Sequence, residues 1–138
     1  MNDHSTKRLA ELVGNRRRCL EQLLNLGRRQ VDLVSLGNMS DLMRLLAAKQ
    51  QLIAALQSLE KELAPFHEQE PDDRVWESSV VRSQCAADAD ACRRLILEVV
   101  DLEQGCEKQI TFRRDEAASK LRNVESGSMI RAAYSKHD

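Results

Sequence analysis

The sequence predicts an all-α protein: an antiparallel helical hairpin plus a long third helix, forming a three-helix bundle with a C-terminal overhang. Two observations indicate this fold. Aromatic residues make up 3% of the 138-residue chain and charged residues 31%, with only two prolines, a composition that favours long helices over sheet. Apolar side chains also recur every three or four residues along three stretches separated by two breaks. We expect one bundle domain over residues 1–124, with helices at about 6–36, 40–64 and 79–123, and a flexible tail over residues 125–138.

The first two stretches predict the hairpin. Gly37 suits the left-handed position that ends a helix, and Asn38 with Asp41 forms a capping pair for the next helix. So short a joint between two long helices indicates antiparallel packing. The inward side of the first helix is predicted to carry Leu9, Val13, Leu20, Leu23, Val31 and Val34. The seam of the second is predicted to carry Leu42, Leu45, Lys49, Leu52, Leu56, Leu59 and Leu63, and Leu46 and Ile53 widen it.

Lys49 is the polar member of the second seam. We expect its long side chain to run along the apolar face and to carry its ammonium to the edge of the bundle. The segment from Pro65 to about residue 78 is predicted to break the chain, because it contains both prolines and an acidic cluster. Phe66, Val75 and Trp76 are expected to seal the end of the bundle there.

The third stretch is longer than its predicted partners. At 1.5 Å per residue it spans roughly 65–70 Å, against about 45 Å and about 36 Å for the first two helices. Its partners therefore reach only to about Gln109, and the apolar residues that follow lack an intramolecular partner. We interpret this overhang and the tail as a partner-binding surface, with candidate residues Ile110, Phe112, Ala117, Leu121, Val124, Met129, Ile130 and Tyr134.

The four cysteines are interpreted as reduced core thiols. Cys85, Cys92 and Cys106 lie seven and fourteen residues apart, which returns each to one helix face, where cysteine acts as a small buried apolar residue. The chain has no CxxC pair, so neither a zinc site nor a disulfide framework is expected. His67 lies among acids on a proline-broken loop that follows no recognised metal motif.

Several function classes are disfavoured. A net charge of −1 with dispersed arginine clusters argues against nucleic-acid binding. There is no apolar run of membrane-spanning length and no hydrophobic signal core, so we expect a cytoplasmic protein without membrane insertion. No nucleophile motif, phosphate-binding glycine loop or metal motif is present, so we expect neither an enzyme nor a cofactor.

Residues 36–60, LGNMSDLMRLLAAKQQLIAALQSLE, resemble the core of the FlgN-type flagellar export chaperones. The shared features are the tight Gly-Asn joint, a leucine-rich helix with an internal lysine, and a closing Leu-x-x-Leu-Glu. The resemblance implies a cytoplasmic chaperone of the bacterial flagellum that binds the C-terminal helical segments of unassembled hook-associated proteins. It further implies delivery of these clients to the flagellar type III export apparatus, with an export-gate component as a second candidate partner.

Two other functions use the same surface. A structural coiled-coil protein would pair its overhang with a second copy, and a regulatory one would sequester a helical partner. Self-association predicts a heptad pattern over residues 110–124 with apolar residues at the seam positions. In this chain Arg114 occupies one of those positions. A chaperone predicts a monomer or a weak homodimer.

Overall fold

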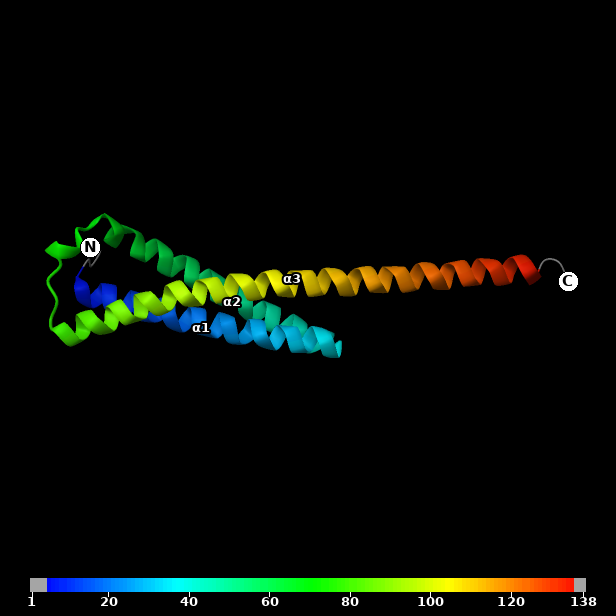
Figure 1. Cartoon of the computed structure of the whole chain (residues 1–138), viewed down its shortest axis with the longest axis horizontal. Helices are drawn as coiled ribbons and strands as arrows, with labels where there is room; N and C mark the ends of the chain where they lie inside the picture. Colours follow the sequence, from blue (N-terminus) through cyan, green and yellow to red (C-terminus); the bar gives the residue numbers. More distant parts are fainter. Residues whose placement is uncertain (1–4, 136–138) are drawn as a thin grey trace.

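The computed structural model describes the backbone of residues 5–135 and the side chains of residues 5–124. Three helices account for most of this part: α1 (Thr6–Leu36), α2 (Met39–Leu63) and α3 (Ser79–Ser135). Two short 3₁₀ turns, η1 (Ala64–Glu68) and η2 (Pro71–Asp73), lie between α2 and α3. Within the described residues there is no strand, and the helices pack against one another, which confirms the predicted all-α three-helix bundle (Figure 1).

The joint between α1 and α2 forms as the sequence predicts. Gly37 adopts a left-handed conformation with φ 71°, and its N–H donates to the carbonyl of Val34 at 3.2 Å. The N–H of Asn38 donates to the carbonyl of Leu33 at 3.1 Å, so the carbonyls of Leu33 and Val34 in the last turn of α1 are satisfied. The side-chain oxygen of Asn38 then accepts from the N–H of Asp41 at 3.2 Å. This joint reverses the chain and lays α2 antiparallel to α1.

α1 is the helix on which the other two pack. α2 and α3 each make extensive contact with α1, and they make little contact with each other. The core is correspondingly divided along α1 into three groups. The group at the start of α1 contains Leu9, Leu12, Val13, Leu63, Phe66 and Cys85; the middle group contains Cys19, Leu20, Leu23 and Cys92; the group near the joint contains Leu33, Leu42 and Leu45. Within the described residues, the last group draws on α1 and α2 alone.

The connection between α2 and α3 closes one end of the bundle. Phe66 is almost fully buried there and Trp76 packs against the same core group. Val75 was expected to join them, and this expectation is wrong, because 84% of its surface is exposed. Its backbone carbonyl instead accepts a hydrogen bond from the Thr6 hydroxyl at 2.7 Å, which holds the extended segment before α3 against the start of α1.

α3 continues past the point where the sequence predicts its end. The expected boundary is near Asn123 with a tail over residues 125–138, whereas α3 runs to Ser135 (Figure 1). Residues 124–135 contain no proline, and the single Gly127 costs only about 1 kcal/mol relative to alanine. The helix therefore has no strong stop signal before its last turn. Flexibility of residues 125–138 stays a prediction.

Candidate functional site

The candidate site begins where α3 extends beyond α1 and α2. Cys106 lies against α1, with its Sγ 3.7 Å from the Gly27 carbonyl oxygen. The amide nitrogen of Gln109 donates to the Val31 carbonyl at 3.2 Å and to the Ser35 hydroxyl at 3.0 Å. These are the last hydrogen bonds between α3 and another helix within the described residues. The boundary agrees with the position that helix lengths predict, and residues 110–135 extend roughly 39 Å beyond it.

An apolar stripe continues along this overhang. Ile110, Ala117, Leu121 and Val124 follow one another at spacings of seven, four and three residues, so they share one helix face. Because Ile110 lies four residues after Cys106, this is the same face that packs on α1 earlier in α3. All four residues are exposed, Leu121 by 65% and Val124 by 68%. The seam of the bundle thus extends into solvent without a partner from the described chain. We call these four residues the overhang stripe.

Phe112 does not belong to the overhang stripe. It lies two residues after Ile110, which rotates it by about 200° around the helix axis, to the opposite side. It is 65% exposed, as is Leu121. α3 therefore places Phe112 apart from the four residues of the overhang stripe. The remaining candidates, Met129, Ile130 and Tyr134, fall within the backbone range of α3, but their side chains lie outside the described residues.

Charged side chains flank the overhang stripe. Glu116 and Lys120 form an ion pair at 3.3 Å along the helix surface. Arg114 occupies a seam position between Ile110 and Ala117, so a positive charge interrupts the stripe. The further charges of this region are Arg113, Asp115 and Arg122. Apolar surface of this kind, divided and rimmed by charge, suits a reversible contact better than a permanent one.

A groove between α2 and α3 adjoins the overhang stripe. It has a volume of about 690 Å³ and exists because these two helices pack on α1 and not closely on each other. Leu46 and Ile53 line it from α2, and Val99, Val100 and Ile110 line it from α3. Since Ile110 belongs to both surfaces, the groove leads into the overhang stripe as one path, and charged residues such as Glu103, Glu107 and Arg114 lie among its apolar residues. The α2 side of this path was not among the predicted site residues, although the unusual width of the α2 seam at Leu46 and Ile53 was a signal for it.

Lys49 lies in this groove with its ammonium buried. Its Nζ donates to the side-chain oxygen of Gln30 on α1 at 2.7 Å and forms an ion pair with Glu103 on α3. Lys49 is 5% exposed, so the expectation that its ammonium reaches the edge of the bundle is wrong. Gln30 and Glu103 offer oxygen atoms where the ammonium enters the core, so it need not reach water to be satisfied. One side chain thereby connects all three helices.

The cysteines of the core are free thiols. Cys19, Cys85, Cys92 and Cys106 are all buried and unpaired by disulfides. Burial raises the pKa of each thiol, because desolvation disfavours the thiolate. At neutral pH all four therefore remain protonated, and Cys106 lines the groove as an apolar group and not as a nucleophile. The described residues contain no group of three or more side chains placed to hold a metal ion.

No protein-family model, no curated protein and no solved structure matches this chain. Within the described residues, no helix has the length and apolarity that crossing a bilayer requires.

Proposed function

We propose that this protein is an export chaperone of the FlgN type, which binds unassembled flagellar hook-associated proteins and delivers them to the flagellar type III export apparatus. The observation that carries the proposal is the overhang stripe, in which the packing face of α3 continues beyond Gln109 without a partner helix from the described part of the chain. The resemblance of residues 36–60 to those chaperones supplies the class of client. The bound element would be an amphipathic helix at the C-terminal end of the client.

An amphipathic client helix fits the overhang stripe for a physical reason. On the earlier part of α3, this face packs on α1, which is itself an amphipathic helix. A client helix would continue that packing where α1 ends, with anchors at spacings of three, four and seven residues. The groove between α2 and α3 provides a second apolar segment next to Ile110. Such a client helix exposes its own apolar face until it is assembled, and pairing would cover it in the meantime.

Release is part of the proposed function, and the surface favours it. Arg114 interrupts the apolar stripe, and the flanking charges of the overhang keep the rim of the contact hydrated. An interface of limited apolar area with a polar rim forms transient complexes. The same charges would also keep the unbound overhang hydrated, and this would limit self-association. We therefore propose a monomer or a weak homodimer in the cytoplasm, to which an export-gate component binds as a second partner.

Coexpression with individual hook-associated proteins tests this function. The full chain and a chain ending at Gln109 would each be purified by an affinity tag, and the captured client would be quantified. We expect the full chain to retain a hook-associated protein that the shorter chain loses. Equal capture by both would move the site to α1 and α2. If the full chain captures no hook-associated protein, the proposed function is wrong, and if it captures only its own copies, the structural coiled coil replaces it.

A further inference from the structure

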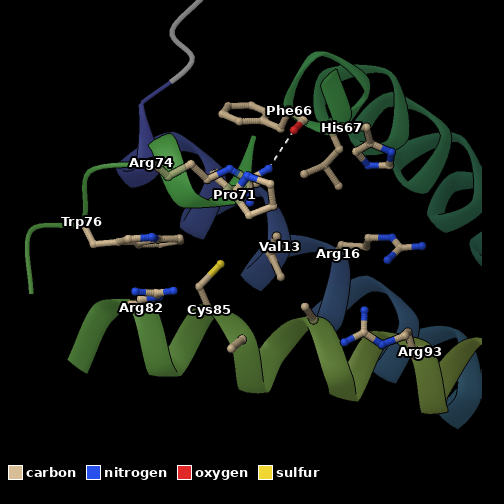
Figure 2. Close-up of a pocket in the computed structure, with 14 residues that line it drawn as sticks. Val13, Arg16, Phe66, His67, Pro71, Arg74, Trp76, Arg82, Cys85 and Arg93 are labelled. Atoms are coloured by element: carbon tan, nitrogen blue, oxygen red, sulfur yellow. Dashed lines mark hydrogen bonds between the residues drawn. The ribbon is translucent and has the colours of Figure 1, made fainter. Parts of the chain in front are cut away.

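A pocket lies at the other end of the bundle from the overhang. Its volume is about 440 Å³, and it opens between the connection after α2 and the first turns of α3 (Figure 2). Its inner wall is apolar, formed by Val13 from α1, Phe66 from η1, and Cys85, Ala86 and Ala89 from α3. Pockets that hold small molecules have this size and this apolar character, with a few polar groups that orient the ligand.

The polar groups of this pocket are all basic or neutral. Arg16, Arg74, Arg82, Arg93 and His67 line it, and none of the described residues that line it carries a carboxylate. The chain as a whole carries a net charge of −1, so the composition does not account for this concentration of positive groups. The pocket is therefore electropositive over an apolar wall, a combination that favours an anion with an apolar body.

Two of the four arginines already have acidic partners. Arg16 forms an ion pair with Glu60 from α2, and Arg93 forms one with Asp90 on its own helix. In Figure 2 the guanidinium of Arg16 points away from Val13 and the middle of the pocket. These two arginines lie on the side of the pocket remote from Trp76.

The other two arginines lie near Trp76. Arg74 donates to the carbonyl of Phe66 at 2.7 Å, so its guanidinium holds the connection in place (Figure 2). Within the described residues, the side chain of Arg82 has neither a hydrogen bond nor an ion pair. Figure 2 shows Arg82 on α3 below Trp76, at the margin of the pocket. Among the described residues that line the pocket, Arg82 is thus the cation that remains free to bind an anion.

We propose that this pocket binds a small organic acid, whose carboxylate pairs with Arg82 and whose apolar body lies along Cys85, Ala86 and Ala89. A guanidinium binds a carboxylate through two parallel hydrogen bonds, and the adjacent apolar wall adds the burial of the ligand body. The site is separate from the overhang stripe, so the inference does not depend on the proposed function. It predicts that both the charge and the apolar body of the ligand are needed.

The single tryptophan of the chain gives a direct readout, because Trp76 lines this pocket. Octanoate, octanol and acetate would each be titrated into the full chain while Trp76 fluorescence is recorded. We expect a saturable change with octanoate at concentrations where octanol and acetate give none. Octanol binding as tightly as octanoate, or no saturable change with millimolar octanoate, would overturn the proposal.

Substitutions then assign the anion contact. Arg82→Gln is expected to weaken octanoate binding by about tenfold or more, since it removes a charge-assisted pair. Arg113→Gln removes an exposed arginine from the overhang and is expected to leave binding within about twofold of the parent chain. Ala86→Glu places a carboxylate beside the proposed site and is expected to weaken binding as Arg82→Gln does. Unchanged affinity in both Arg82→Gln and Ala86→Glu, with the helical content of the parent chain, would contradict the proposal.

Discussion

The ammonium of Lys49 lies 2.7 Å from the side-chain oxygen of Gln30, and both residues are buried, at 5% and 3% exposure. Two polar side chains therefore meet inside a core that is otherwise apolar. Glu103 completes the arrangement from α3 and is itself half-exposed, so it brings a countercharge without being buried. The contact joins α2 to α1 at the height where Glu103 of α3 reaches Lys49.

Replacement of Lys49 alone is expected to destabilise the bundle. Lys49→Met leaves the Gln30 oxygen buried without a donor, which costs about 1–3 kcal/mol of unfolding free energy. The double variant Lys49→Met/Gln30→Met removes both polar groups and is expected to recover most of that loss. Urea unfolding followed by circular dichroism measures both variants. If Lys49→Met is as stable as the parent chain, the Lys49–Gln30 contact does not contribute to the stability of the fold.

Gly27 leaves no room for a side chain unless Leu102 moves. A Cβ at Gly27 would lie 2.6 Å from Cδ2 and 3.3 Å from Cγ of Leu102, so α1 and α3 approach closely there. Gly27→Val is expected to lower the unfolding free energy by about 1–3 kcal/mol through overpacking. Thermal unfolding checks this, and a melting temperature equal to that of the parent would refute the close approach.

Gly105 provides the opposite case. Apart from the glycine itself, its two chain neighbours and the adjacent backbone of α3, no described atom lies within 4 Å of a Cβ placed at this residue, and α3 continues through it as one helix (Figure 1). Gly105→Ala is therefore expected to raise the unfolding free energy by about 0.5–1 kcal/mol, since alanine is the better helix former. The same thermal unfolding measurement applies. A loss of stability would mean that α3 needs the conformational freedom of glycine where the bundle ends.

The buried thiols make stability depend on pH above neutrality. Burial raises the pKa of Cys85 and Cys92 in the folded chain above the ordinary value of 9.0, so the unfolded chain loses these protons first. The contribution of these two buried thiols to the free energy of unfolding is intact below pH 9 and is lost as the pH rises from 9 towards the pKa of the folded state. Urea unfolding at pH 7 and pH 9.5 is expected to show lower stability at the higher pH. Cys92→Ala should lower stability at both values and reduce the difference between them; an unchanged difference would exclude Cys92 as a source.

The groove between α2 and α3 is expected to contribute to client binding. Val100 lines it and is 48% exposed, whereas Leu97 is 70% exposed and does not line it. Val100→Glu should weaken the capture of a hook-associated protein by about fivefold or more, because it replaces an apolar side chain of the groove with a charged one. Leu97→Glu serves as the matched control and should bind as the parent does. If Val100→Glu captures the client as well as Leu97→Glu does, the groove does not contribute to binding and the site is confined to the overhang.

Much of the fold could be predicted because it depends on local patterns. Gly37 and Asn38 mark the joint by their backbone and capping preferences alone. The rise per residue, applied to the predicted lengths of the three helices, placed the end of the contact between α3 and its partner helices at about Gln109. The continuation of α3 to Ser135 could not be predicted as readily, because Gly127 is a weak signal that neighbouring helix-forming residues outweigh.

The missed features depend on how helices pack. Lys49 meets partners 19 and 54 residues away, and no local pattern indicates which polar groups converge on it. The open groove arises because α2 and α3 both pack closely on α1 and make little contact with each other, an arrangement that apolar stripes alone do not determine. The position of Phe112 is different, since its spacing from Ile110 already places it on another face.

The most direct test of the overhang stripe compares two variants that differ only in the face they alter. Leu121→Glu disrupts the stripe, and Phe112→Glu alters the opposite face at equal exposure of 65%. The affinity of each for a purified C-terminal segment of a hook-associated protein would be measured by isothermal titration calorimetry. We expect Leu121→Glu to lose at least about tenfold in affinity and Phe112→Glu to bind as the parent chain does. Parent-like binding by Leu121→Glu, or an equal loss in both variants, would contradict the assignment of the stripe as the client-binding surface.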